Sequence, residues 1–345
     1  FSLEYDLFSE IRDMIAGEVI RIQNTAKAIA KIDVFASLAN VAEHNNYVRP
    51  KINEKGVIDI KDGRHPVVEK MIPNDMFIAN DTLLDNSSNR INIITGPNMA
   101  GKSTYMRQTA LIVLMAQIGS FVPASSANIG ICDRIFTRVG ASDDLASGQS
   151  TFMVEMTEVA NILRNATANS LLILDEIGRG TSTFDGLSIA WAVVEHISNP
   201  KLLGAKTLFA THYHQLIALE DELSGVKNYS VAVKERGNDI VFLRRIIAGG
   251  TDRSYGVHVA RLAGLPKKVL DRANEILQEY DRCESGLYPV KQAPVVEEAP
   301  QMMGSLFSSG LADQILKLDV MSMTPIEAMN ALYKLQEEAR KESGR

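Results

Sequence analysis

Apolar residues return every three or four positions over the first part of the chain, and charged residues fill the positions between them. This is the pattern of an amphipathic helix. The repeat runs from Ile11 to Val41 and stops near Asn45-Asn46, with Pro50 close behind. The sequence therefore predicts a helical arm over residues 1–48.

The pattern then changes to short apolar, β-like runs that alternate with helical segments of about ten to fifteen residues. Such alternation is typical of an α/β fold in which helices cover a mainly parallel sheet. We expect this domain over residues 49–284, with an antiparallel hairpin at its edge (229–233 and 240–243) and a closing helix (269–280). The runs that predict the strands are 57–60, 91–95, 135–139, 171–174 and 207–210.

Residues 285–310 contain three prolines, two adjacent glutamates and few residues that could form a core, so we expect a flexible linker there. Beyond it, Thr324-Pro325-Ile326-Glu327 has the form of a capping box at a helix start. The apolar face of that helix is too small to be buried alone. Residues 311–345 are therefore expected to be a helical oligomerisation segment.

Composition narrows the class of protein. The chain has 345 residues, 46% of them hydrophobic and 23% charged, which is enough to bury a core. Its two cysteines, Cys132 and Cys283, are far apart, which argues against a disulfide framework or a zinc cluster and favours a reducing, cytoplasmic setting. The apolar run 109–124 is interrupted by Gln117 and Gly119, so we interpret it as a buried helix and expect no membrane span.

Charge and chain start also bear on function. The net charge of −6 gives no broad basic surface of the kind that drives nonspecific DNA binding. If the protein serves DNA, most of the surface that grips DNA is expected elsewhere. The chain begins at Phe1, inside the predicted helix, so we expect it to be a piece of a longer protein.

One segment matches the phosphate-loop pattern G-x-x-x-x-G-K-[ST], with an apolar strand before it and a helical pattern after it. Glycines let successive N–H groups point at the β-phosphate, Lys102 neutralises the β/γ charge, and the Ser103 hydroxyl would ligate Mg²⁺. This motif predicts binding of ATP with Mg²⁺. Its residues are Gly96, Pro97, Asn98, Met99, Ala100, Gly101, Lys102 and Ser103.

The run 171–174 ends in two acids, Asp175 and Glu176, at the strand end where open α/β sheets place their ligands. Asp175 is expected to hold the Mg²⁺ shell. Glu176 is expected to orient or deprotonate the attacking water. A strand that merely leaves into a polar loop is the structural alternative.

Three further segments are less specific alone. Residues 147–153 place small hydroxyl residues before an apolar helix, which could be a second anion site or an ordinary helix cap. The polar loop 178–186 follows the acids directly, and such a loop is expected only at a site or a subunit contact. His212 ends another strand and could bond a γ-phosphate or serve only structure.

Together these motifs resemble the ATPase region of the MutS family of bacterial DNA mismatch-repair proteins. The resemblance covers about residues 1–280, with weaker similarity at the C-terminal helix. Four segments carry it: Thr95-Gly-Pro-Asn-Met-Ala-Gly-Lys-Ser-Thr104, Ser150-Thr-Phe-Met-Val-Glu-Met156, Leu174-Asp-Glu-Ile-Gly-Arg-Gly-Thr-Ser-Thr183 and Ala210-Thr-His212.

The resemblance implies an ABC-type phosphate-loop ATPase in which two subunits sandwich ATP. It assigns Ser150 to the γ-phosphate bound by the other subunit and His212 to the role of switch histidine. Phe77 and Ile78 would cover the adenine, and Thr104 would complete the nucleotide-binding loop. A further adenine-side histidine of the family falls at Ser230 here, so one wall of the base pocket departs from the family pattern.

The resemblance also implies partners: a homodimer through the ATPase domains, a higher oligomer through the C-terminal helix, and a MutL-type protein. The arm resembles the base of the lever that joins the ATPase to the DNA clamp. Nothing resembles the mismatch-reading domain, so mismatched DNA would be bound through domains outside this chain. Residues 301–307 resemble a loosened sliding-clamp peptide, with packing against the ATPase body as the favoured alternative.

The leading hypothesis is thus an ATP-hydrolysing dimerisation domain that switches the grip of a longer protein on mismatched DNA. An ABC transporter subunit would need a Leu-Ser-Gly-Gly-Gln signature, of which the chain keeps only Ser147-Gly148-Gln149. A nucleotide-gated assembly module with little turnover is the remaining alternative, against which Glu176 and His212 argue.

Overall fold

The computed structural model describes residues 1–72, 77–97, 100–140, 150–236, 239–251 and 255–284. The chain divides into two units, Phe1–Leu277 and Gln278–Arg345. The helices are α1 (Ser2–Gly17), α2 (Val19–His44), α3 (Val68–Met71), α4 (Lys102–Gln117), α5 (Thr151–Asn165), α6 (Thr183–Ser198), the 3₁₀ helix η2 (His214–Ala218), α7 (Leu219–Glu222), α8 (Gly256–Leu262) and α9 (Lys267–Glu284). The strands are β1 (Lys51–Asn53), β2 (Ile58–Gly63), β3 (Asn80–Leu84), β4 (Ile91–Thr95), β5 (Ser126–Gly130), β6 (Ile135–Arg138), β7 (Leu171–Asp175), β8 (Lys206–Ala210), β9 (Val226–Arg236) and β10 (Asp239–Ala248).

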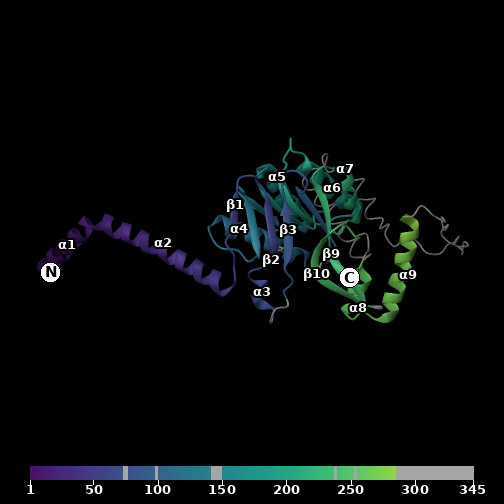
Figure 1. Ribbon diagram of the computed structural model, residues 1–345, viewed down its shortest axis with the longest axis horizontal. Helices are drawn as coiled ribbons and strands as arrows, with labels where there is room; N and C mark the ends of the chain where they lie inside the picture. The colour runs from purple at the N-terminus through teal and green to yellow at the C-terminus, as the bar shows by residue number, and fades with distance from the viewer. Residues whose placement is uncertain (73–76, 98–99, 141–149, 237–238, 252–254, 285–345) are drawn as a thin grey trace, which may run out of the picture. The chain divides into compact units, whose positions relative to one another are not determined.

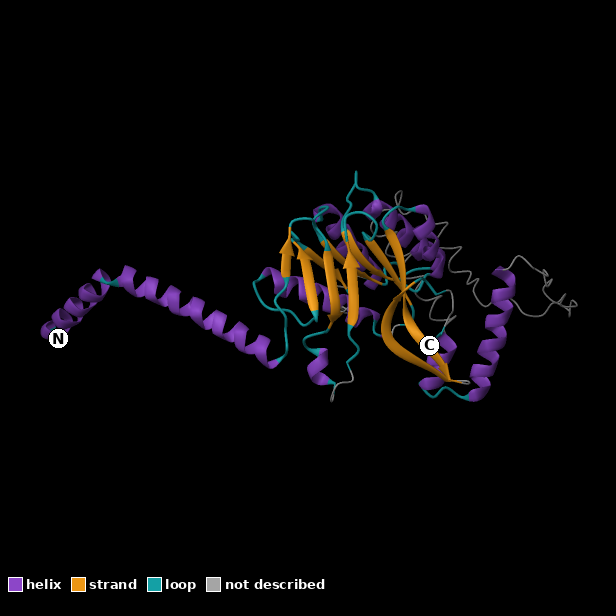
Figure 2. Cartoon of the chain, viewed as in Figure 1, coloured by secondary structure: helices purple, strands orange, loops and turns teal. Residues whose placement is uncertain are grey.

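The strands form two sheets (Figures 1 and 2). The larger has the order β10-β9-β4-β8-β7-β6, and all its pairs are parallel except β9 with β10. The smaller has the order β1-β5-β2-β3 and is mostly antiparallel. The predicted α/β fold with a mainly parallel sheet is therefore confirmed for the six-stranded sheet.

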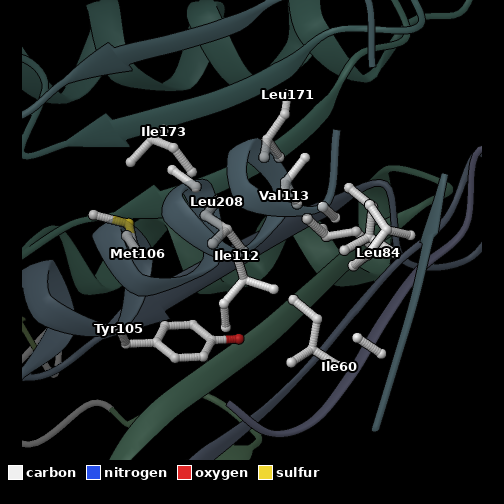
Figure 3. Packing of buried hydrophobic residues seen from close by; sticks show 14 of the residues in the cluster. Ile60, Leu84, Tyr105, Met106, Ile112, Val113, Leu171, Ile173 and Leu208 are labelled. Atoms are coloured by element: carbon white, nitrogen blue, oxygen red, sulfur yellow. The ribbon is translucent and has the colours of Figure 1, made fainter. Parts of the chain in front are cut away.

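Helix α4 lies in the core between the two sheets (Figure 3). Its residues Met106, Ile112 and Val113 are fully buried and share a cluster with side chains of β2, β3, β7 and β8. The predicted buried helix is confirmed over residues 109–117, whereas residues 118–124 of the apolar run lie beyond the end of α4. The buried side chains of α4 thus anchor the helix that begins directly after the phosphate loop.

The central strands of the larger sheet are buried on both faces, which explains their continuous apolar runs. On β7, Leu171 and Ile173 face the α4 cluster, whereas Leu172 and Leu174 face a second cluster with α5 and α6. Both faces of β7 are covered along its whole length, and the two acids come at its C-terminal end.

The predicted hairpin is confirmed and is longer than expected, because β9 pairs with β4 and so extends the main sheet. The arm is helical as predicted but is interrupted at Glu18, directly after Gly17. Its apolar side chains are largely exposed; Ala42 is buried. The predicted linker and C-terminal segment, 285–345, lie outside the described residues.

Candidate functional site

The phosphate loop joins β4 to α4, as the sequence predicted. All five residues of β4 are buried, and α4 begins at Lys102 with Gly101 as its N-cap. Gly101 has a left-handed backbone (φ +99°), which a side chain would disfavour. The first N–H groups of α4 therefore face the loop and are suited to an anion. Asn98 and Met99 lie outside the described residues.

Lys102 is the charged residue of the loop and is only 1% exposed. Its amino group donates to the carbonyl oxygen of Gly96, which closes the loop on itself. Burial lowers the pKa of Lys102, while the nearby carboxylates of Glu176 and Asp175 raise it. The structure thus brings the three predicted residues into one electrostatic cluster.

Ser103 and Asp175 meet at the start of α4 and the end of β7. The Ser103 hydroxyl donates to Asp175 Oδ2 at 2.6 Å. Asp175 is 9% exposed, and its Oδ1 is buried with no hydrogen-bond partner among the described atoms. Burial raises the pKa of Asp175, although the hydrogen bond from Ser103 opposes the shift.

This arrangement fits a hard divalent cation. Mg²⁺ prefers oxygen ligands and binds through one or two protein groups together with substrate phosphates. The unpartnered Oδ1 and the adjacent hydroxyl supply such oxygens. Among the described residues, no group of three or more His, Cys, Asp or Glu side chains could hold a metal ion.

Glu176 follows Asp175 and turns away from the strand. Its backbone is left-handed (φ +57°), and its N–H donates to the carbonyl of Ala210 at 2.9 Å. One carboxylate oxygen pairs with Arg179, while the other is buried without a hydrogen-bond partner in the described part of the chain. The second oxygen is therefore the one positioned to accept a proton or a hydrogen bond.

His212 lies at the same edge of the sheet, because Asp175 pairs with Ala210 in the parallel register of β7 and β8. Its ring contacts the ring of Tyr213 in a tilted arrangement, with 4.2 Å between centroids and 36° between the ring planes. Loss of hydration lowers the pKa of His212; Glu176 acts to raise it, and Arg179 acts to lower it further. A neutral imidazole at physiological pH can donate to a phosphate oxygen without a change of protonation.

A cavity of about 410 Å³ opens beside these groups. It is lined by the predicted residues Ser103, Asp175 and Glu176. It is also lined by Thr151, Arg179 and Gly180, which belong to the two segments 147–153 and 178–186 singled out in the sequence. The remaining lining residues were not selected by sequence reasoning: Arg107, Arg138, Val139, Gly140 and Glu155. A charge at the end of an apolar strand run, as at Arg138, was the available signal.

Ser150 is the N-cap of α5, and its hydroxyl accepts a hydrogen bond from the Met153 N–H at 3.2 Å. It does not line the cavity of its own chain, although Thr151 next to it does. The ordinary capping role is thus confirmed. A role toward a phosphate stays a prediction.

Phe77 and Ile78 line a second cavity, of about 210 Å³, together with Gly101 and Thr104 of the phosphate loop. Both predicted adenine contacts are therefore beside the loop. Ser230 is buried opposite Thr95 in the sheet and does not line this cavity. Sequence reasoning missed six other lining residues: Val68, Ile72, Asn80, Tyr105, Gln108 and Arg244.

Among the residues that the structure describes, no helix is long and apolar enough to cross a membrane. Comparison with known proteins identifies the family of the chain. A family model of MutS domain V matches residues 92–281.

Similar proteins include the DNA mismatch repair protein MutS of Lachnoclostridium phytofermentans, 73% identical over 309 residues, or 89% of this chain and 33% of the relative. Proteins of the same name from Ruminiclostridium cellulolyticum and Acetivibrio thermocellus are 59% and 56% identical over 97% and 98% of this chain, and 39% of each relative. The chain thus spans between a third and two fifths of the length of these relatives. On the strength of the domain match and the phosphate-loop site, the chain belongs to the MutS family and contains its domain V, the ABC-type ATPase domain.

Proposed function

We propose that this chain binds ATP with Mg²⁺ and hydrolyses it to ADP and phosphate. The observation that carries the proposal is the contact of Ser103 Oγ with Asp175 Oδ2, which joins the phosphate loop to the acids at the end of β7. This is the pairing that a phosphate-loop hydrolase requires.

The residues divide the work. Lys102 and the N–H groups at the start of α4 neutralise the β- and γ-phosphates. Ser103 and Asp175 would hold Mg²⁺, which would withdraw charge from the phosphate oxygens when bound. Glu176 accepts a proton from water as its oxygen attacks the γ-phosphorus and the bond to the β–γ bridging oxygen breaks. His212 contacts the γ-phosphate and reports its presence.

We further propose a composite site in a homodimer. Ser150 caps a helix whose start carries positive partial charge, yet it does not line its own chain's cavity. The γ-phosphate held by a second copy is the ligand that this hydroxyl suits. The adenine would lie against Phe77 and Ile78.

In a longer MutS protein this ATPase would switch the grip on mismatched DNA, which other domains would bind. Support for that role comes from the relatives, which are named as DNA mismatch repair proteins. A MutL-type partner, the sliding clamp and a cytoplasmic, nucleoid-associated setting belong to the same proposal. The segments proposed for clamp binding and further oligomerisation, 301–307 and 311–345, lie outside the described residues.

One observation favours a second candidate, a nucleotide-gated module with little turnover. Arg179 pairs with one carboxylate oxygen of Glu176, and this contact makes that oxygen less accessible to an attacking water. A single-turnover assay separates the two functions, since the module would bind ATP and release almost no phosphate.

The roles are tested by two variants in an equilibrium ATP titration and a phosphate-release assay. Glu176→Ala should keep ATP affinity within about threefold and lower turnover at least about a hundredfold, because only the chemical step uses the acid. Lys102→Ala should weaken ATP binding itself. The exposed residues Glu222 and Lys201 provide matched controls as Glu222→Ala and Lys201→Ala. Loss of ATP binding in the Glu176 variant would contradict the assignment.

A further inference from the structure

The peptide groups on both sides of Gly178 are held by two buried side chains from different parts of the site. The Gly178 N–H donates to Glu155 Oε1 on α5. The Gly178 carbonyl accepts a hydrogen bond from the Tyr213 hydroxyl at 2.9 Å. Gly178 lies two residues after Glu176, so these bonds fix the backbone that carries the acid.

Glu155 comes from the helix that begins after Ser150 and is 5% exposed. Arg138, at the end of β6, forms ion pairs with two carboxylates of α5, at 3.8 Å from Glu155 and 2.9 Å from Glu158. A buried ion pair is weak evidence for stability, because apolar residues of the same size often serve as well. Glu155 does something that such a replacement could not, since it accepts the Gly178 N–H.

Tyr213 follows His212 directly, is 4% exposed, and contacts its ring in a tilted arrangement. Burial raises the pKa of Tyr213, and the charge of Glu155 raises it further, so the hydroxyl stays protonated and able to donate. The same tyrosine therefore contacts the proposed switch histidine with its ring and the Gly178 carbonyl with its hydroxyl.

The backbone at Gly178 is tightly packed against neighbouring segments. Gly178 has φ +87°, and a Cβ there would lie 2.4 Å from the carbonyl oxygen of Gly186. A Cβ on Gly186 would lie 2.1 Å from the Gly178 oxygen and 2.2 Å from the Tyr213 hydroxyl. The backbone at Gly178 thus rests directly on the first turn of α6.

The first turn of α5 touches the same loop. A Cβ on Gly180 would lie 3.0 Å from Cβ of Phe152, two residues after Ser150. Together with the bond from Gly178 to Glu155, this gives α5 two contacts with the loop behind Glu176. A shift at the start of α5 must therefore move the loop.

We propose that Glu155 and Tyr213 are positioning residues for ATP hydrolysis, which together hold the backbone at Gly178 and so couple the start of α5 and His212 to the orientation of Glu176. The inference rests on the proposed ATPase function. It predicts that these two residues, which lie away from the phosphates, affect the rate of hydrolysis and have little effect on ATP affinity.

Two conservative changes test the two bonds separately in the full chain. Tyr213→Phe keeps the ring and removes the donor. Glu155→Ala removes the acceptor, and Glu155→Gln restores one. We expect Tyr213→Phe and Glu155→Ala each to slow single-turnover hydrolysis about tenfold, the effect of one buried hydrogen bond, and Glu155→Gln to recover most of the rate.

Matched controls separate positioning from general packing. Tyr47→Phe removes the hydroxyl of another buried tyrosine, which contacts Glu69 at 3.4 Å in a different part of the fold. Glu158→Ala removes the other carboxylate that pairs with Arg138, on the same helix but half exposed, and for which no bond to Gly178 is seen. Both controls should keep the wild-type single-turnover rate within about twofold.

The ATP dissociation constant and the thermal midpoint are measured for every variant. ATP affinity should change less than about twofold in Tyr213→Phe, and the double variant Tyr213→Phe, Glu155→Ala should lose less than the product of the single losses, because both act on one junction. A wild-type hydrolysis rate in Tyr213→Phe would overturn this inference and leave the proposed ATPase function standing. Losses matched by the controls would overturn it as well, whereas a wild-type chain without hydrolysis would contradict the proposed function too.

Discussion

Glu176 has the backbone conformation that residues with a side chain rarely adopt, φ +57°. The left-handed region disfavours such residues by roughly 1–2 kcal/mol. The bond from the Glu176 N–H to the Ala210 carbonyl holds the turn, and Gly178 continues it with a positive φ. The structure thus projects the carboxylate beyond the edge of the sheet at the expense of local backbone energy, as functional sites often do.

The same conflict between function and stability predicts the effect of Asp175→Asn. Burial raises the pKa of Asp175, which means that folding disfavours its charged form. The contribution is destabilising above the folded-state pKa and disappears as pH falls toward the unfolded value near 3.8. At pH 7 without nucleotide, we expect Asp175→Asn to raise the free energy of unfolding by about 1 kcal/mol and to abolish Mg²⁺-dependent hydrolysis.

Asp133→Asn is the matched control, and it should change the free energy of unfolding in the opposite direction. Burial acts to raise the pKa of Asp133, but hydrogen bonds from Thr167 and Ser170 at 2.6 and 2.8 Å outweigh it and hold the pKa below its usual value. Its stabilisation is complete above pH 4 and is lost as pH falls through the folded-state pKa. Denaturant unfolding from pH 4 to 8 should show opposite changes for the two variants; a loss of stability in Asp175→Asn at pH 7 would contradict the argument.

At the residue scale, the sequence predicted those site residues that belong to contiguous motifs. Lys102, Ser103, Asp175 and Glu176 meet as expected, and His212 lies at the same edge. Glu155 stood in a quoted motif without a role, and neither Tyr213 nor Arg138 was selected. Their roles depend on contacts between segments far apart in the chain, which spacing along the sequence does not encode.

At the scale of elements, burial decided which strands were predictable. β4, β7 and β8 are buried on both faces and form continuous apolar runs, so their positions were predicted within a residue or two. β3 and β5 bury alternate or scattered positions and contain polar residues, and β1 has only three residues. Most of the smaller sheet was therefore missed, although β2 was predicted.

The start of α5 combines two functions that mutation can separate. The Ser150 hydroxyl caps the helix, and removing an N-cap costs about 1 kcal/mol. Aspartate caps as well as serine does but brings a negative charge. We expect Ser150→Asp to keep the thermal midpoint of the wild type and to slow hydrolysis at least about tenfold, since the charge would face a γ-phosphate.

Ser150→Asn provides the neutral match, of nearly the same size and also a good cap. Its hydrolysis rate should lie well above that of Ser150→Asp, while both variants melt alike in calorimetry. Equal hydrolysis in the wild type and Ser150→Asp would show that this helix start faces no phosphate, and the proposal of a γ-phosphate contact there would then be wrong.

At the scale of the whole chain, charge predicts weak attachment to DNA. The net charge is −6, and nonspecific binding requires released counterions from many Lys and Arg contacts. We expect dissociation constants of about 10 μM or weaker at 150 mM salt, with no preference for a mismatch over a matched duplex. Fluorescence anisotropy with two otherwise identical duplexes measures both; a mismatch-selective affinity would show that this chain itself reads the mismatch.

The central claim is ATP hydrolysis at a site completed by a second copy of the chain. It is tested most directly by the initial rate of phosphate release per chain, measured over protein concentrations that span the monomer–dimer transition seen by sedimentation. The composite site predicts a rate per chain that rises with concentration and levels off when the dimer is saturated. A rate per chain that stays constant across that transition, or is absent throughout, would contradict the account.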